Sequence, residues 1–366
     1  MRQDRIQGIA YLWRIGVYSM EIRQVRTGEI QQAIELADRI FRDEGHASMG
    51  VSFPHVFSNQ VQFSFGAFED GKLVSFIGLV PFKIIVGDAI LDVFSIGAVC
   101  TDEAYQKRGI STMILREVYS FIDKAGASLL FVSGDRGLYR RNDCHYFGSV
   151  SEYTISGPLA GHDGEVRVWE KSDLFQIDRI RRETAVRYEA TPWEWSALVQ
   201  SGGYASISKM GQEVFVSERD GSVEAYAVIG IPAENSAHKH GIVTDWGGNP
   251  QEVCGILSKA LEMKGLDRIE ISVPFHDNLN QHLSGHRMRE TGNGGTVYIV
   301  NHTRLFGQIK PYLLSSGYTE ETVNDLKQKL DLLTTEERIA QLFGSGAGKT
   351  NVPQVPLPST TGLWYV

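Results

Sequence analysis

The segment Gln106-Lys107-Arg108-Gly109-Ile110-Ser111 has residue types and a position that suit anion binding. It follows an apolar run that predicts a strand ending at Val99, and it leads into an amphipathic stretch that predicts a helix. The first N–H groups of a helix have no partner within the helix, and the helix dipole favours negative charge there. The turn is therefore predicted to bind a phosphate or pyrophosphate. Taken alone, these residues also fit a solvated basic turn before a surface helix.

The elements that must position this turn form a regular series. Two strand-like runs joined by Asp70-Gly71 predict a hairpin, because both residues readily adopt positive φ. A strand over 90–99, a helix over 111–125 and a buried strand over 127–133 follow. Such a series predicts an α/β unit in which a strand, the polar turn and a helix follow one another directly.

The same series recurs later in the chain. Asp220-Gly221 lies 150 positions after Asp70-Gly71, and Asn249-Pro250 opens another predicted helix as N-cap and first residue. The repeat indicates a tandem duplication. The turn of the second copy, residues 245–249, has no Lys or Arg, and Asp245 would repel phosphate, so this half is expected to lack the anion site.

Composition excludes several classes of protein. The 366 residues include 36 basic and 44 acidic side chains, a net charge of −8, which disfavours nucleic acid and anionic membranes as partners. No run of about 18 apolar residues predicts a membrane span. Three cysteines, far apart, argue against a disulfide framework and against a thiolate metal site, so a cytoplasmic protein without a metal is expected. The chain begins at Met1, but Met20 opens the first clear strand and is the favoured start, with Met1 left open.

The turn resembles the acyl-CoA signature R/Q-x-x-G-x-G/A of the GNAT (GCN5-related N-acetyltransferase) superfamily, with Gln106, Gly109 and Ser111 at the marked positions. Ser111 replaces Gly or Ala. Residues 138–144 resemble the Leu-Tyr-x-x-x-Gly-Phe segment of that family, although Asp143 and Cys144 replace Gly and Phe. The resemblance covers about residues 20–157. It implies an α/β (α+β) GNAT fold, a mixed and mostly antiparallel sheet flanked by helices, here duplicated and followed by a C-terminal helical tail.

The resemblance also implies a site. Acetyl-CoA would be the acyl donor, and Tyr139 corresponds to the tyrosine that protonates the departing thiolate. The backbone would bind the pantetheine arm and the pyrophosphate of CoA through Ala98, Val99, Cys100, Gln106, Lys107, Arg108, Gly109, Ile110 and Ser111. A base must also take the amine proton, and four carboxylates that the sequence does not rank are Glu69, Asp92, Glu103 and Asp135. Whether the carboxylate of Val366 reaches the site is left open.

Shifts in composition divide the chain into five segments. These are an N-terminal extension (1–19), a catalytic GNAT domain (20–157), a linker with a helix (158–195), a degenerate GNAT-like domain (196–310), and C-terminal helices with an extended tail (311–366). The second domain is expected to help form the acceptor pocket, and Trp193, Trp195 and Trp246 are either walls of that pocket or core residues.

The function expected is an acetyl-CoA-dependent N-acetyltransferase that acts on a primary amine of a small molecule or peptide. A basic, aminoglycoside-like amine would suit the acidic protein. The alternative is a non-catalytic acyl-CoA sensor or assembly module, and the oligomeric state is left open. A third hypothesis, a P-loop hydrolase built on residues 344–350, is disfavoured because Phe343 stands where the pattern needs glycine and prolines follow the run.

Overall fold

The computed structural model describes residues 11–15, 18–159, 161–344 and 354–366. Within these ranges, nine strands form a first sheet in the order β1-β2-β3-β4-β5-β6-β16-β7, with β10 paired to β4. The strands of this sheet are β1 (Tyr11–Ile15), β2 (Tyr18–Gln24), β3 (Phe65–Glu69), β4 (Lys72–Val86), β5 (Ala89–Thr101), β6 (Leu129–Val132), β7 (His145–Tyr146), β10 (Val186–Glu189) and β16 (Thr296–Ile299).

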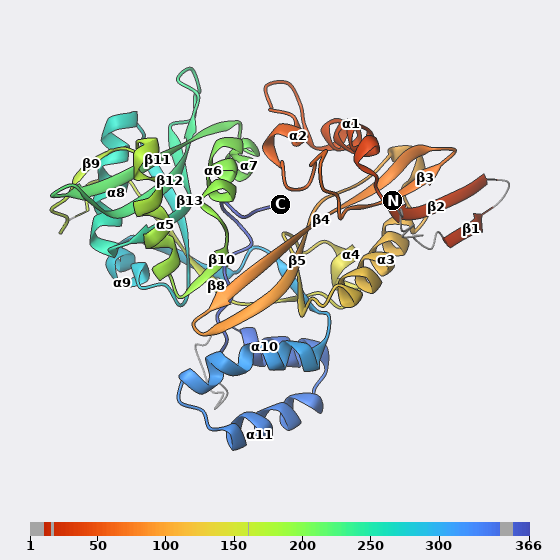
Figure 1. Cartoon of the computed structure of the whole chain (residues 1–366). Helices are drawn as coiled ribbons and strands as arrows, with labels where there is room; N and C mark the ends of the chain where they lie inside the picture. The colour runs from red at the N-terminus through yellow and green to blue at the C-terminus, as the bar shows by residue number, and fades with distance from the viewer. Residues whose placement is uncertain (1–10, 16–17, 160, 345–353) are drawn as a thin grey trace, which may run out of the picture.

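A second sheet lies beside the first (Figure 1). Its order is β15-β8-β14-β13-β12-β11-β9. The strands of this sheet are β8 (Ser149–Ile155), β9 (Glu165–Val168), β11 (Met210–Arg219), β12 (Ser222–Pro232), β13 (His240–Gly248), β14 (Arg268–Pro274) and β15 (Arg287–Gly292). In both sheets the central pairing is parallel, between β5 and β6 and between β13 and β14, and each parallel pair is joined by a helix of 15 residues.

Helices cover both sheets. The helices of the first unit, our name for the first sheet and its covering helices, are α1 (Ile30–Phe41), α2 (Met49–Ser52), α3 (Ile110–Lys124) and α4 (Gly137–Arg140). Those of the second unit, defined in the same way on the second sheet, are α5 (Leu174–Glu183), α6 (Pro192–Ser201), α7 (Gly203–Ser206), α8 (Pro250–Lys264) and α9 (Leu279–Leu283). None of the helices in the described ranges is long and apolar enough to cross a membrane.

The duplication is visible in the hairpins. Asp70 and Asp220 both have φ of 50°, and each is followed by a glycine with φ near 80°, as a tight two-residue turn requires. A register shift falls between residues 67 and 68 in the first hairpin and between residues 217 and 218 in the second, again 150 positions apart. The mixed α/β fold predicted from the sequence, with its repeat and its C-terminal helices, is confirmed.

The two units exchange strands. β8 follows β7 directly in the chain but pairs with β14 and β15 in the second sheet. β16 follows β15 but pairs with β6 and β7 in the first sheet. The segment predicted as a linker, residues 158–195, also supplies a strand to each sheet, β9 to the second and β10 to the first. The predicted domain boundaries remain predictions, but no single cut between residues 145 and 299 would leave both sheets whole.

Three C-terminal helices, α10 (His302–Ser315), α11 (Glu320–Asp331) and α12 (Thr335–Phe343), pack below the tip of the β4–β5 hairpin (Figure 1). Residues 354–366 then return to the middle of the molecule, where the chain ends between α7 and β4. This tail contains no helix. Most of the P-loop-like run 344–350 lies outside the described residues, but the absence of a helix over 354–366 argues against that hypothesis.

Candidate active site

The predicted phosphate turn lies where β5 leads into α3. α3 begins at Ile110, and its N-cap is Gly109, with φ of 75° and no capping side chain. The backbone N–H groups of residues 107–111 donate to no acceptor within the described part of the chain. A Cβ on Gly109 would meet nothing within 4 Å, so the turn is open to a ligand. The arrangement is a helix N-terminus with free donors, which suits an anion.

The strand before the turn carries a bulge. Phe76 pairs with Cys100 and Gly78 with Gly97, so Ala98 and Val99 together face a single residue of β4. Ala98 accordingly has φ of 52°. On the other edge of β5, pairing with β6 stops at Ile96, so the backbone from residue 97 onward has a free edge there. A ligand with amide groups could hydrogen-bond along this edge as an added strand would.

Two cavities meet at this free edge. The inner cavity, our name for a space of about 220 Å³, is lined by residues of β5, by Met49 of α2, by the ends of α1 and β6 and by the C-terminal residues. The loop cavity, a space of about 480 Å³, is lined by the turn and by the start of α3. Both cavities share Val99, Arg136 and Tyr139 as lining residues. Together they form a path from the helix N-terminus to the bulge.

Tyr139 stands where the two cavities join. It belongs to α4, is 7% exposed, and its hydroxyl makes no hydrogen bond with any described residue. Burial raises the pKa of the Tyr139 hydroxyl well above its ordinary value, while Arg136 acts in the opposite direction. A tyrosine in this state is protonated at neutral pH, so it can donate a proton and does not act as a base.

Most of the predicted binding residues come together here. Ala98 and Val99 line the inner cavity, and the loop cavity is lined by Cys100, Gln106, Lys107, Gly109, Ile110 and Ser111. Arg108 is the exception, because its guanidinium donates to the Ala104 carbonyl and lies over the Tyr105 ring, outside the cavity lining. Ser111, the departure from the signature, bonds through its hydroxyl to Thr101 at 3.0 Å and ties the helix to the end of β5.

The cysteines near the site are core residues. Cys100 and Cys144 are 4% and 0% exposed. Burial raises the pKa of the Cys100 thiol to about 12 and that of the Cys144 thiol to about 11. Thiolates are the reactive form, so neither residue has the environment of a nucleophile.

Sequence reasoning missed two arginines. Arg136 and Arg141 line the loop cavity from α4 and its flanks, across from the turn. Neither makes an ion pair with a carboxylate among the described residues. The basic run 136–141 around Tyr139 could have indicated them in the sequence. Positive charge in this run suits a polyanionic ligand better than packing within a loop.

None of the four carboxylates named from the sequence lines the inner cavity. Glu69 accepts a hydrogen bond from Tyr105, Asp92 pairs with Lys83, and Asp135 accepts from Tyr146. Glu103 lies in the one-turn 3₁₀ helix before the phosphate turn. These carboxylates are therefore poorly placed to take a proton from an amine in the inner cavity.

The C-terminal residue is in the inner cavity instead. Val366 is 6% exposed, and its backbone carboxyl end lies so close to β5 that a Cβ on Gly97 would collide with it. Glycine is therefore required where the bulge begins. Tyr365 lines the same cavity and packs between Phe53 and Tyr204, with ring centroids 6.1 and 5.4 Å away.

None of the three tryptophans weighed as pocket walls or core residues lines the inner cavity. Trp195 is fully buried in the core of the second unit, and Trp193 is 75% exposed. Trp246 lines the groove of the second unit. Among the described residues of the second unit, Ile207 alone lines the inner cavity. The C-terminal tail, which crosses the second unit, adds Tyr365 and Val366.

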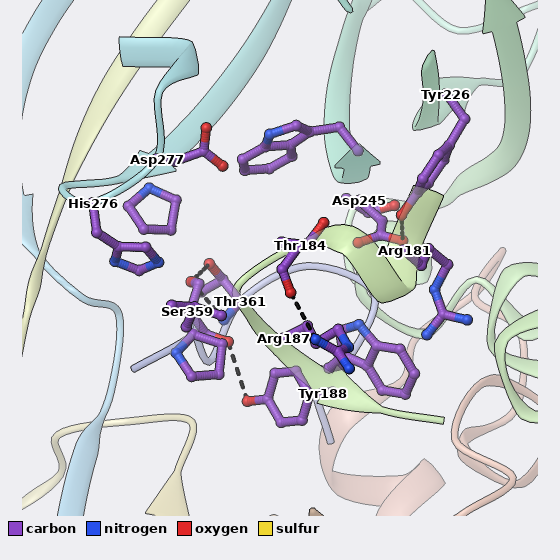
Figure 2. A pocket seen from close by; sticks show the side chains of 16 residues that line it. Arg181, Thr184, Arg187, Tyr188, Tyr226, Asp245, His276, Asp277, Ser359 and Thr361 are labelled. Carbon is purple, nitrogen blue, oxygen red and sulfur yellow. Dashed lines mark hydrogen bonds between the residues drawn. The ribbon is translucent and has the colours of Figure 1, made fainter. Parts of the chain in front are cut away.

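In the second unit, the equivalent groove is partly filled by that tail. Thr244 is the extra residue of a bulge in β13, as Ala98 is in β5, and the Leu363 N–H donates to its carbonyl. Figure 2 shows Ser359 and Thr361 of the tail facing residues of α5, β10 and the end of β14, and the Tyr188 hydroxyl donates to the Ser359 carbonyl. A space of about 110 Å³ remains beside Asp245, and a larger one of about 930 Å³ adjoins it along residues 246–250.

The helix that follows this second bulge is capped from within. The Asn249 side chain accepts from the Gln251 N–H, and Pro250, as first residue, has no N–H to offer. Asp245 accepts from Trp195 and Tyr226. The absence of a phosphate site in this half stays a prediction, and the cap and the proline add to the charge argument for it.

Comparison with known proteins agrees with this geometry. Residues 21–147 match the family model described as an acetyltransferase (GNAT) domain. These residues are a GNAT acetyltransferase domain. The GNAT domain holds the bulge, the phosphate turn, α3 and Tyr139, so the resemblance inferred from the sequence is confirmed and the domain is of the acyltransferase class. No curated protein sequence is similar enough to register as a match.

Solved structures extend the likeness beyond the GNAT domain. A probable N-acyltransferase from Enterococcus faecalis superimposes with a TM-score of 0.64 at 15% identity, over 80% of this chain and 75% of that one. A GCN5-related N-acetyltransferase from Anabaena variabilis gives 0.62 at 12% identity, over 79% and 75%. Saccharomyces cerevisiae N-myristoyltransferase with bound myristoyl-CoA gives 0.51 at 10% identity, over 79% and 84%. At such identities these structures share the fold with this chain.

Proposed function

We propose that this chain transfers an acetyl group from acetyl-CoA to a primary amine of a small molecule or peptide, by direct attack of the amine on the thioester. The observation that carries the proposal is the path of two joined cavities between the free N–H groups of residues 107–111 and the bulge of β5. Acetyl-CoA carries a pyrophosphate and a thioester at separate places along its length. The pyrophosphate would lie at the N–H groups of residues 107–111 and the thioester at the bulge of β5.

The residues present fit CoA. The pyrophosphate would be held by the free N–H groups of the turn and by the cations Lys107, Arg136 and Arg141, which line the loop cavity. The pantetheine arm would hydrogen-bond to the free edge of β5 beyond Ile96. When bound, the thioester supplies the activated acyl group.

The side chains and backbone around the bulge would then perform three tasks. The backbone N–H groups of Ala98 and Val99 are the proposed donors to the tetrahedral oxyanion. As the C–N bond forms and the C–S bond breaks, the Tyr139 hydroxyl donates its proton to the sulfur, which leaves as the CoA thiol. A base takes the proton that the amine nitrogen loses. That proton then returns to the Tyr139 oxygen, so the enzyme is ready for another cycle.

We propose that, in a polypeptide that ends at Val366, the terminal carboxyl group of this residue is the base. In a polypeptide that ends at this residue, the group is a carboxylate, and it lies in the inner cavity beside Gly97 with no ion-pair partner within 4.0 Å among the described residues. A carboxylate at the bulge, without a direct ion pair, is placed to accept the proton that the attacking amine loses.

The proposal is tested by acceptor-dependent release of the CoA thiol, measured against a library of amines. Tyr139→Phe should lower kcat about 100-fold, the lower end of general-acid effects, and leave the affinity for acetyl-CoA unchanged. Because the pKa of Tyr139 is raised, the acid is lost only above the ordinary tyrosine value of about 10, so kcat should not fall between pH 8 and about pH 10. A fall of kcat within that window that is absent from Tyr139→Phe would contradict the raised pKa of Tyr139. An unchanged kcat in Tyr139→Phe at neutral pH would contradict the acid role.

The sensor hypothesis predicts a different pattern. A non-catalytic module would bind acetyl-CoA and release no thiol with any amine, and Tyr139→Phe would change neither property. A thioester with a longer acyl chain is a second donor to include in the assay, because the N-myristoyltransferase fold neighbour holds one.

A further inference from the structure

The inner cavity carries positive charge on its side chains. Its charged side chains are Arg42 and Arg136, and no Asp or Glu of the described residues lines it. The only negative group proposed there is the carboxylate of Val366, which two arginines outweigh, so the cavity does not favour an acceptor with several positive charges, whatever the net charge of the whole protein. The aminoglycoside-like acceptor that suits the overall composition is therefore disfavoured at the site itself.

Arg42 is short of partners. One of its guanidinium nitrogens donates to the Ser206 hydroxyl at 3.0 Å, and its Nε is buried without a hydrogen-bond partner. No carboxylate among the described residues lies within 4.0 Å of the guanidinium. Burial lowers the pKa of Arg42, and Asp38 and Tyr365 act in the opposite direction. An unpaired buried donor is costly, and a ligand carboxylate would satisfy it.

The remaining walls of the inner cavity are apolar. They include Phe41, Met49, Phe53 and Ile207, with the ring of Tyr365. The volume of about 220 Å³ is below the roughly 300–1,000 Å³ of sites for drug-sized ligands. Such a space suits a small molecule with one apolar group.

We propose that the acceptor is a small amine that also carries a carboxylate and an apolar group, as an aromatic or aliphatic α-amino acid does, and that Arg42 binds the carboxylate. This inference rests on the proposed transferase function. Arg42 reaches the cavity from the end of α1, and Ser206 of α7 orients it from the second unit. The second unit thus takes part in acceptor recognition by positioning a residue of the first.

The test compares apolar α-amino acids with their methyl esters as acceptors, with CoA thiol release as the readout. The wild type should use the free acids with a kcat/KM about 10- to 100-fold higher than the esters, the range expected for hydrogen bonds to a charged group. Arg42→Gln should remove this preference by lowering kcat/KM for the acids alone, and Arg42→Lys should retain part of it.

Arg39→Gln is the matched control, because Arg39 lies on the same helix, pairs with Asp102 and does not line the cavity. It should keep the preference for acids. Calorimetric titration with acetyl-CoA shows whether each variant is folded and whether the proposed function holds. Absence of acetyl-CoA binding to the wild type would defeat the transferase function itself. Binding of acetyl-CoA together with equal use of esters, no use of any acid, or an acid preference that survives Arg42→Gln would overturn the inference alone.

Discussion

The two units place a bulged strand and a 15-residue helix in the same arrangement, yet they treat the helix N-terminus differently. In the first unit Gly109 leaves the N–H groups of the turn free, and cations surround them. In the second unit Asn249 caps the helix and Pro250 removes a donor. A duplicated fold therefore keeps its sheet and helix while a few residues at one turn differ, and we propose that these residues decide which copy holds an anion.

The grooves differ as well. The groove of the first unit is open, and that of the second unit is crossed by the C-terminal tail, which is hydrogen-bonded to the bulge at Thr244. The same tail then delivers Val366 to the bulge of the first unit. In this arrangement the second unit holds the tail whose last residue lies at the bulge of the first unit.

The largest effect is expected from moving the carboxylate. Adding one glycine after Val366 replaces the proposed base by an amide and should lower kcat by about 100-fold or more, with little change in acetyl-CoA affinity. Steady-state kinetics and calorimetry measure the two quantities. A second variant, Val366→Ala, keeps the carboxylate and should retain most of kcat. Equal losses in both variants would show that tail packing, and not the carboxylate, is what matters.

The second-largest effect is expected from a variant that loosens the tail from the second unit. Leu363 is 5% exposed in the core of that unit, so Leu363→Ala should lower the free energy of unfolding by about 2–5 kcal/mol, measured by denaturant titration. Because the tail is anchored there, kcat should also fall. An unchanged kcat in a destabilised variant would mean that Val366 keeps its place without the second unit.

A smaller effect is expected from one cation of the loop cavity. Arg141→Gln should weaken acetyl-CoA binding by about tenfold, and the loss should shrink at high salt because the residue is exposed. Arg187→Gln, the matched change in the groove of the second unit, should leave the affinity unaltered. Equal effects would show that both grooves bind the ligand.

The smallest effect is a change in stability alone. Asn249→Ala removes the cap of α8 and should cost about 1 kcal/mol of unfolding free energy, with acetyl-CoA affinity and kcat unchanged. Loss of acetyl-CoA binding in this variant would place a ligand site at the N-terminus of α8 and contradict the proposed difference between the two units.

Features that depend on neighbouring residues could be predicted from the sequence. Asp70-Gly71 and Asp220-Gly221 turn their hairpins, and Asn249-Pro250 opens α8, because the bonds that favour them join residues a few positions apart. The capping box of Thr334 and Glu337, which begins α12, is likewise formed by residues three positions apart. The phosphate turn belongs to this class, since its donors are consecutive.

Features that join distant segments could not be predicted. β16 pairs with β6 across more than 160 positions, and Val366 reaches Gly97 from the other end of the chain. The sequence of a short apolar strand does not indicate which strand it pairs with. The exchange of strands between the two sheets could therefore not be predicted. Arg42 was missed because a single arginine at a helix end is ordinary, and only the cavity shows that it lacks a partner.

We propose that the N-terminus of α3 binds the acyl donor and that the N-terminus of α8 does not. Calorimetric titration with acetyl-CoA tests this proposal most directly. We expect one site per chain in the wild type, no detectable binding to Gly109→Glu, and retained binding to Gly126→Glu, which introduces the same residue at a positive-φ glycine at the other end of α3. Two sites per chain, or an affinity that survives Gly109→Glu, would contradict it.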